Sequence, residues 1–216
     1  MAKKKLTSET LTEKYIDALL LHPEELTSIY KFCKFINIEE VEFYSFYSSF
    51  EGLENNIFIS LFEATLATLH DSKEYKDFDD RNKLLLFYYT FFENLKLNRS
   101  AVKAIIGDNL MRPNNQQKLS SLKNSFESYI NTFALGFNLL DNDNLKQIES
   151  AGIKFASWSH FMLLMKYWLE DNSNNFENTD VLIEKSVNTG LDVLESNILT
   201  QMFDLGKFLL KDKINL

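Results

Sequence analysis

The sequence of 216 residues contains one cysteine, two prolines and six glycines. The single cysteine, Cys33, has no partner for a disulfide within the chain, which is typical of proteins in a reducing compartment. So few glycines and prolines supply too few turns for an all-β protein and favour long helices. No stretch of about 18 uncharged apolar residues is present, so the sequence predicts no transmembrane segment. We therefore expect a cytoplasmic protein.

Basic residues are also scarce. The chain has 23 Lys and Arg against 31 Asp and Glu, and its formal net charge is −8. This acidic balance repels phosphate backbones and anionic lipid surfaces. Aromatic residues make up 14% of the chain and include 19 Phe, which is more than a core of this size needs. The composition indicates a globular, acidic protein with a surplus of aromatic side chains.

Apolar residues recur with a helical period along nearly the whole chain, and no run alternates as a half-buried strand would. The spacing predicts helices over 10–21, 27–35, 38–47, 50–69, 82–97, 100–107, 114–137, 153–169 and 179–211. Asn37 separates two short helices and tolerates the left-handed conformation of a tight turn. The polar stretch from 70 to 80 predicts a boundary between an N-terminal domain, 1–70, and a C-terminal domain, 71–216. The predicted fold class is all-α.

The last predicted helix carries a continuous apolar stripe with steps of three and four residues. The stripe consists of Ile183, Val187, Leu191, Leu194, Ile198, Met202, Leu205 and Leu209. A stripe of this length is too long for one small domain to cover, so we predict that it pairs with a second copy of the chain.

Residues 27–53 read TSIYKFCKFINIEEVEFYSFYSSFEGL. They resemble the N-terminal module of TetR-family regulators, which reads roughly T-S/T-V and then A-G-V-S-x-G-T-L-Y-x-H-F-x-S-K-E-x-L. Ile29 and Ile38 stand for buried valines of that module, and Phe43 with Tyr44 stands for Leu-Tyr of its DNA-reading helix. The resemblance implies an N-terminal helix-turn-helix bundle and a C-terminal bundle for ligand binding and dimerisation. It also implies that the last two helices of two copies form a four-helix interface.

The segment departs from the family pattern where DNA would be contacted. Glu39, Glu40 and Glu42 replace small or basic residues, and Phe50 replaces a phosphate-contacting Lys. From 9 to 55, three lysines against nine glutamates and one aspartate give a formal charge of −7. Because helix-turn-helix affinity comes mainly from neutralising phosphates, we predict that DNA binding is lost. With Tyr44, these four residues mark either a solvated face or a docking surface for a protein partner.

Residues 167–187 form a second resemblance, on the residues YWLEDNSNNFENTDVLIEKSV. They look like a W-x-x-D-x-S signature of certain TetR C-terminal domains, and similar spacing occurs in TetR-shaped accessory proteins of ubiquinone biosynthesis. That resemblance implies a protein that has lost DNA binding, holds an isoprenoid-like lipid and acts through a protein partner. The alternative for Asp171, Ser173 and Thr179 is a turn in which Thr179 caps the last helix.

A set of aromatic and methionine side chains at helical spacing could line a cavity for an apolar small molecule or lipid. The predicted ligand-binding residues are Tyr88, Phe91, Tyr129, Phe133, Trp158, Phe161, Met162 and Met165. The alternative is that these side chains simply fill a core. His22, His70 and His160 lie far apart in the sequence, and none has a second metal ligand at suitable spacing. We predict no metal site, no cofactor and no catalytic residue.

The leading hypothesis is a homodimeric binding protein that holds an apolar molecule and contacts another protein. The rival is a ligand-responsive transcriptional repressor, with Lys3, Lys4 and Lys5 as an arm in the DNA minor groove. No sequence motif supports an enzyme.

Overall fold

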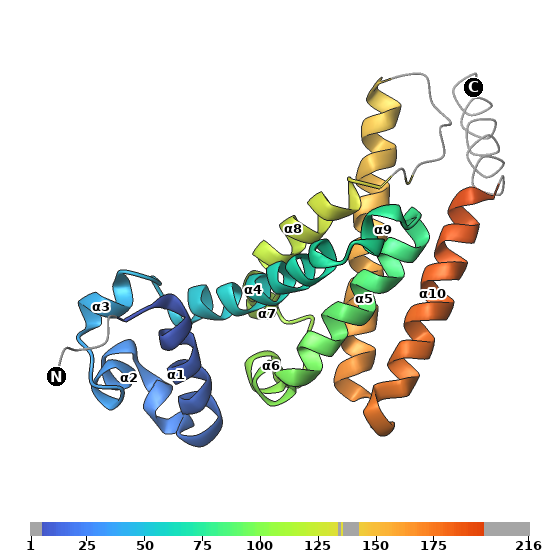
Figure 1. Ribbon diagram of the computed structural model, residues 1–216. Helices are drawn as coiled ribbons and strands as arrows, with labels where there is room; N and C mark the ends of the chain where they lie inside the picture. Colours follow the sequence, from blue (N-terminus) through green and yellow to red (C-terminus); the bar gives the residue numbers. More distant parts are fainter. Residues whose placement is uncertain (1–5, 134, 136–142, 197–216) are drawn as a thin grey trace, which may run out of the picture. The chain divides into compact units, whose positions relative to one another are not determined.

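The computed structural model describes residues 6–133, 135 and 143–196 (Figure 1). All regular elements among these residues are helices, and none is a strand, so the predicted all-α class is confirmed. Within the same residues, no helix combines the length and the apolar character needed to cross a membrane.

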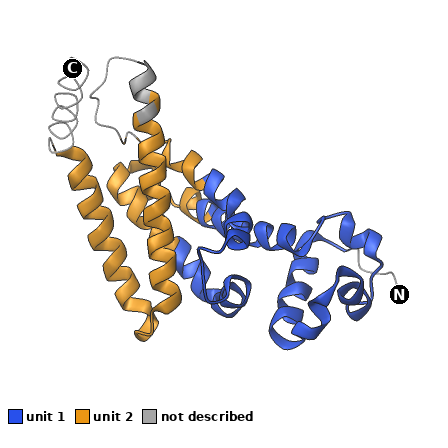
Figure 2. Cartoon of the chain, turned by 180° about the vertical axis from the view of Figure 1, so that it is seen from behind, with its two compact units in different colours: residues 1–67, 91–125 blue, residues 68–90, 126–216 orange. Residues whose placement is uncertain are grey.

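The chain divides into two compact units (Figure 2). Unit 1 contains Met1–Ala67 and Phe91–Ser125, and unit 2 contains Thr68–Thr90 and Phe126–Leu216. The first division falls close to the expected residue 70, but unit 1 also takes in residues 91–125. The assignment of 1–70 and 71–216 to separate domains stays a prediction.

Unit 1 begins with α1 (Ser8–Leu21), which starts two residues before the predicted helix over 10–21. The Thr7 hydroxyl accepts a hydrogen bond from the Thr10 amide at 3.2 Å, so Thr7 is the N-cap of this helix. A short 3-10 turn (Pro23–Thr27) leads to α2 (Ile29–Phe35), and α3 (Glu40–Tyr44) follows. Asn37 lies between α2 and α3 with a φ of 58°, as expected for the tight turn.

The rest of unit 1 comes from α4 (Phe50–Asp71) and from the helices between 91 and 125. α6 (Arg99–Ile106) ends at Gly107, whose φ of 65° is the conformation that favours glycine. The predicted helix over 114–137 is two helices, α7 (Pro113–Lys118) and α8 (Ser120–Ile130). Leu119 separates the two helices with φ and ψ of −95° and 2°, and its side chain is buried.

A buried carboxylate joins several elements of unit 1. Glu54 on α4 accepts a hydrogen bond from the Tyr15 hydroxyl at 2.6 Å and pairs with the Lys118 ammonium at 2.9 Å. Lys118 also donates to the carbonyl of Ile105 at 2.9 Å. These contacts connect α1, α4, α6 and α7 through one ion pair, whose charges are compensated although Glu54 is almost fully buried.

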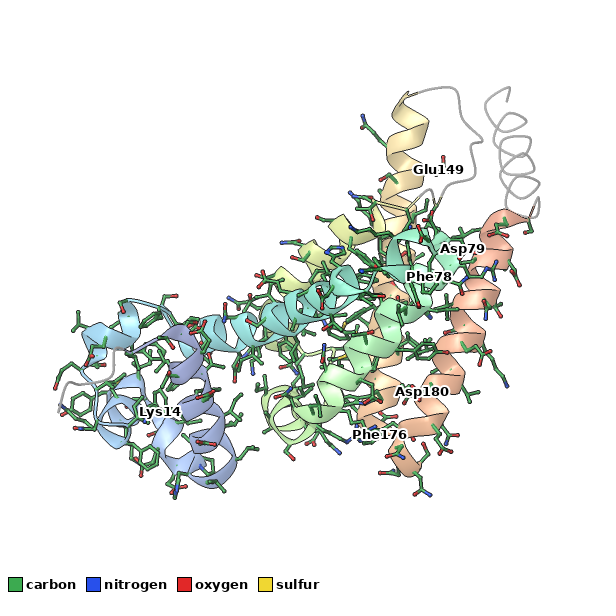
Figure 3. The ribbon with its side chains drawn as sticks, viewed as in Figure 1. Lys14, Phe78, Asp79, Glu149, Phe176 and Asp180 are labelled. Carbon is green, nitrogen blue, oxygen red and sulfur yellow. The ribbon has the colours of Figure 1, made fainter. Side chains whose placement is uncertain are left out.

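Unit 2 is built around α5 (Asp80–Leu97), α9 (Asp143–Glu170) and α10 (Glu177–Glu195). A 3-10 turn (Glu74–Asp77) precedes α5, and a second one (Asn174–Phe176) connects α9 to α10. Arg81 at the start of α5 donates to Asp192 at 2.7 Å and to the Asn188 side chain at 3.1 Å. Figure 3 shows Phe176 and Asp180 at the beginning of α10, where the chain reverses after α9.

Candidate functional site

The interior of unit 2 is aromatic. Trp158 and Phe161 on α9 stack at 5.2 Å between ring centroids, and the Phe161 ring lies 4.8 Å from that of Phe126 on α8. Tyr88 on α5 lies 6.1 Å from Phe161. Tyr129 is in contact with Phe133 at 4.8 Å. The structure therefore gathers five of the predicted ligand-binding residues, from α5, α8, α9 and the residues after α8, into one unit.

The other predicted ligand-binding residues divide between the units. Met162 and Met165 are buried on α9 in unit 2. Phe91 is buried in unit 1, where its ring contacts Phe92. Sequence reasoning missed Phe126, although it lies three and seven residues before Tyr129 and Phe133, the spacing of one helix face. These contacts fit a packed core, and whether the cluster holds a ligand stays a prediction.

A chain of hydrogen bonds crosses this interior from α5 to α10. The Tyr88 hydroxyl lies 3.1 Å from Nδ1 of His160, and Nε2 of His160 lies 2.7 Å from Oγ of Ser186. Ser186 donates its proton to the carbonyl of Leu182 at 2.6 Å, so it must accept from His160. Nδ1 is then the acceptor for the Tyr88 hydroxyl. This network assigns one neutral tautomer to His160, in which only Nε2 carries a proton.

Burial stabilises the same neutral form of His160. Loss of solvent around the ring lowers the pKa of His160 from 6.5 to about 4. A proton on Nδ1 would also prevent this nitrogen from accepting the hydrogen bond of the Tyr88 hydroxyl. At neutral pH the ring therefore acts as a fixed polar bridge between helices.

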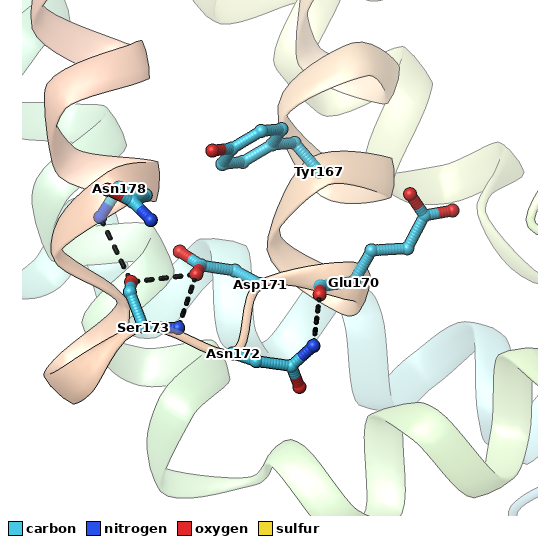
Figure 4. A pocket seen from close by; sticks show the side chains of 6 residues that line it. All are labelled: Tyr167, Glu170, Asp171, Asn172, Ser173 and Asn178. Atoms are coloured by element: carbon cyan, nitrogen blue, oxygen red, sulfur yellow. Dashed lines mark hydrogen bonds between the residues drawn. The ribbon is translucent and has the colours of Figure 1, made fainter.

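A polar hollow of about 550 Å³ lies at the connection between the end of α9 and the start of α10 (Figure 4). Asp171 accepts hydrogen bonds from the amide and hydroxyl of Ser173, at 2.8 and 2.7 Å, with one oxygen. Its other oxygen accepts from the amide and hydroxyl of Thr179, at 3.0 and 2.7 Å. The capping group for α10 is thus the Asp171 carboxylate, and Thr179 is one of its donors rather than the cap.

These hydrogen bonds set the charge state of Asp171. Burial raises the pKa of Asp171, but the bonds from Thr179 and Ser173 together outweigh burial and lower the pKa to about 2. The turn-and-capping interpretation therefore accounts for all three polar residues of the motif. The same hollow is lined by Tyr167, Glu170, Asp171, Asn172, Ser173 and Asn178.

The α2–α3 segment (residues 29–44) presents acidic and apolar side chains to solvent. Glu39 precedes α3, and the Glu42 carboxylate accepts a hydrogen bond from the Glu39 amide at 2.9 Å. Glu42 therefore stabilises the start of the helix. Val41 is 74% exposed and Tyr44 is 52% exposed. Glu40 lies in the first turn of α3 and is half-buried.

Phe50 packs inside unit 1, unlike Glu39, Glu40, Glu42 and Tyr44, which were predicted to share a surface with it. Its ring packs against Tyr15, Phe32 and Phe43 at centroid distances of 5.4, 5.7 and 5.9 Å. The side chain that stands in place of a phosphate-contacting Lys therefore belongs to the aromatic core of unit 1.

Two lysines of the α2–α3 segment form contacts with acidic or carbonyl groups. Lys31 pairs with Glu25 at 3.7 Å and donates to the carbonyl of Glu24 at 2.7 Å. Lys34 pairs with Glu39 at 3.6 Å and lies 5.6 Å from the Tyr30 ring centroid. Neither lysine contributes an uncompensated positive charge at this surface.

A smaller hollow of about 280 Å³ adjoins these side chains. It is lined by Tyr30, Cys33, Lys34, Ile38, Glu39, Glu40 and Val41. Burial, together with the nearby carboxylates of Glu40, Glu39 and Glu42, raises the pKa of the Cys33 thiol to about 11. Cys33 is thus a neutral, apolar part of the floor of this hollow.

The predicted dimer stripe faces the interior of unit 2 over its first half. Ile183, Val187 and Leu191 are buried within the chain itself, and Leu194 is half-buried. These residues are therefore covered by their own unit and do not supply a free surface. The other predicted interface residues, Ile198, Met202, Leu205 and Leu209, lie outside the described residues, as do Lys3, Lys4 and Lys5.

Three of the exposed large apolar side chains of unit 2 lie on α9. Phe155 is 75% exposed and Leu163 is 54% exposed, and Tyr167 follows one turn later. Gly152 lies on the same helix with open space at its Cβ position. No group of three or more His, Cys, Asp or Glu side chains suited to a metal ion occurs in the part of the chain that the structure describes.

Among the described residues, unit 1 contains two short helices joined by a turn, and unit 2 is a helical bundle with an aromatic interior, which together define an all-α protein. Residues 83–209 match the sequence model of a family described as Tetracyclin repressor-like, C-terminal domain. The match spans more than half of the chain, and the chain belongs to this TetR-type family. No curated protein and no solved structure matches it.

Proposed function

We propose that this protein is a TetR-type homodimer that binds an apolar small molecule or lipid and contacts a protein partner instead of DNA. The observation that carries the proposal is the surface of α3, where Glu39, Glu40 and Val41 stand where a DNA-reading helix needs donors. Support also comes from Lys31 and Lys34, whose charges are engaged by Glu25 and Glu39.

Electrostatics argue against duplex DNA at this surface. Each phosphate contact contributes roughly 0.9 to the slope of log K against log salt, and competent proteins bind non-specific DNA at about 10⁻⁴ to 10⁻⁶ M. A segment that offers carboxylates removes these contacts and adds repulsion. Its affinity for duplex DNA should therefore fall below that range even at low salt.

The test is an anisotropy titration of the full chain against pooled genomic fragments at about 50 mM salt. We expect no binding up to about 100 μM. The variant Glu39→Ser/Glu40→Lys/Val41→Lys should gain weak, salt-dependent binding. It leaves Phe50 in the core and Glu42 at the start of α3. A matched control, Glu177→Ser/Asp180→Lys/Val181→Lys, makes the same charge change at the start of α10 and should gain much less.

Micromolar binding by the unaltered protein, abolished by changes in α3, would overturn the proposal. That result would instead establish a ligand-responsive repressor, the rival function. Equal gains by the two triple variants would show that net charge, and not the α3 surface, controls DNA affinity.

The apolar ligand is assigned to unit 2. Support comes from the aromatic cluster, from Met162 and Met165, whose flexible side chains adapt to irregular ligands, and from the family match over 83–209. The short resemblance of residues 167–187 to lipid-binding accessory proteins of ubiquinone biosynthesis favours an isoprenoid-like molecule. Native mass spectrometry of protein purified from its own host should detect an added mass that solvent extraction removes. Only the bare chain mass, at every stage of purification, would contradict this assignment.

The homodimer is proposed to use the exposed face of α9 rather than the buried stripe of α10. Phe155 is 75% exposed and Leu163 is 54% exposed, and exposed apolar side chains that share one face mark a candidate interaction surface. A second copy of the chain would cover this face, as the dimeric architecture typical of the family suggests.

A further inference from the structure

We propose that the hollow beside α3 receives one apolar side chain from a basic, amphipathic peptide segment of the partner protein, with Lys or Arg on both sides of it. This inference rests on the proposed function, in which the α2–α3 segment contacts a protein. It adds the chemistry of the contacting segment and the point at which that segment is anchored.

The size of the hollow favours a side chain over a free small molecule. Its volume of about 280 Å³ lies just below the roughly 300 Å³ at which small-molecule sites begin. Its floor contains the buried side chains of Cys33 and Ile38, which offer no charge. The burial that raises the pKa of Cys33 also keeps the thiol neutral, so the floor remains apolar at physiological pH.

The rim of the hollow provides both apolar area and negative charge. Tyr30 and Val41 are strongly exposed beside the apolar floor, so an incoming apolar group would cover them as well. Glu39 and Glu40 line the same hollow, and most of the Glu39 side chain is exposed. An anionic or neutral segment would leave these carboxylates uncompensated, whereas a flanking Lys or Arg would pair with them.

Lys34, the basic side chain among the described residues that line the hollow, does not cancel this preference. Lys34 is paired with Glu39 at 3.6 Å, and both side chains are about half exposed or more. Exposed pairs of this kind are weak, so a partner's guanidinium can replace Lys34 at Glu39 at little cost. Glu40 also contributes a carboxylate to the rim, and the structure shows no basic side chain within the described lining other than Lys34.

The experiment selects a phage-displayed library of random 12-residue peptides on the full chain. Clones that also bind the Val41→Lys variant are removed. We expect the remaining clones to share one large apolar residue with Lys or Arg nearby on both sides. A synthetic peptide of that consensus should lose roughly 10- to 100-fold in affinity on Val41→Lys, as expected for the loss of one buried apolar anchor. Glu39→Gln/Glu40→Gln should weaken it several-fold at low salt and less at high salt.

Two matched variants separate local from general effects. Val181→Lys changes an exposed valine of unit 2, and Glu177→Gln/Glu184→Gln removes two exposed charges there. Both should leave the peptide affinity within about twofold. Circular dichroism and thermal unfolding should show that Val41→Lys retains the fold, since Val41 is mostly exposed.

An acidic consensus, a consensus without an apolar anchor, or enrichment of no clone specific to the unaltered α3 surface would overturn this inference. The proposed function is judged separately by the DNA titration, which needs no peptide. Tight DNA binding through α3 refutes both ideas, whereas absent DNA binding with no basic consensus refutes this inference alone.

Discussion

Lowering the pH from 7 to 5 should destabilise unit 2 through His160. Folding lowers the pKa of this side chain from 6.5 to about 4, because the ring is buried between Tyr88 and Ser186. Above pH 6.5 both the folded and the unfolded chain carry a neutral ring, and the two states do not differ. Between pH 6.5 and about 4, His160 is protonated in the unfolded chain but stays neutral in the folded chain. Stability is therefore lost as the pH falls from 6.5 towards 4.

The size of this loss follows from the shift. Each pH unit between the two pKa values costs about 1.4 kcal/mol, so the loss at pH 5 is at most about 2 kcal/mol. Carboxylates elsewhere add their own pH dependence. We therefore compare the wild-type protein with His160→Gln, whose amide can accept from Tyr88 and donate to Ser186 without titrating.

The assay is urea unfolding at pH 7, 6 and 5, followed by tryptophan fluorescence. Both tryptophans, Trp158 and Trp168, are buried on α9, so the signal reports on unit 2. Relative to His160→Gln, the wild-type protein should lose about 2 kcal/mol of unfolding free energy between pH 7 and pH 5. His22→Gln, a change at an exposed histidine of unit 1, should retain that loss. Parallel pH profiles for the wild-type protein and His160→Gln, within about 0.5 kcal/mol, would refute the reasoning.

Three further predictions concern other contacts. Asp171→Asn should lower the unfolding free energy by about 1–3 kcal/mol in urea titrations at pH 7, because charge-assisted hydrogen bonds at the start of α10 are lost. That effect should shrink as the pH falls from about 4 towards 2, and an unchanged stability at pH 7 would contradict it. Glu54→Gln should lower the unfolding free energy by about 3–5 kcal/mol, because Lys118 is left without its carboxylate. Glu54→Met/Lys118→Met should recover most of that loss. Equal losses for the two variants would argue against the ion pair. Leu163→Glu should give a stable monomer in sedimentation velocity, whereas Leu191→Glu should unfold the chain because Leu191 is buried; a dimer that survives Leu163→Glu would exclude the α9 face.

Helical periodicity was enough to predict the fold class and most element positions. Asn37 marked the α2–α3 turn because few other residues adopt a positive φ at so little cost. The predicted helix over 114–137 was wrong in two respects, since the chain breaks it at Leu119 and α8 ends at Ile130. Periodicity does not reveal the break, because residues 112–118, RPNNQQK, contain no large apolar side chain whose spacing could be followed up to Leu119. The helix predicted over 153–169 begins ten residues earlier, at Asp143.

The candidate sites depended on contacts that sequence spacing does not specify. The stripe of Ile183, Val187 and Leu191 indicated a buried face, but the period of a helix cannot say whether its own chain or a second copy covers that face. In the same way, Thr179 was predicted to cap α10, whereas the cap comes from Asp171, eight residues earlier. The link between Tyr88, His160 and Ser186 joins residues 72 and 26 positions apart, and no local pattern marks it.

The order of the two units along the chain has a practical consequence. α4, α5 and α8 each cross from one unit to the other, so the chain passes between the units three times. No single proteolytic cut or truncation can therefore release either unit intact. A fragment that begins after residue 70 would keep α6 and α7 but lose α1 and most of α4, and Lys118 would face no carboxylate from Glu54. Limited proteolysis between the units should give nicked chains that stay associated, and each unit should be obtainable alone only by joining its two separate segments with a new linker.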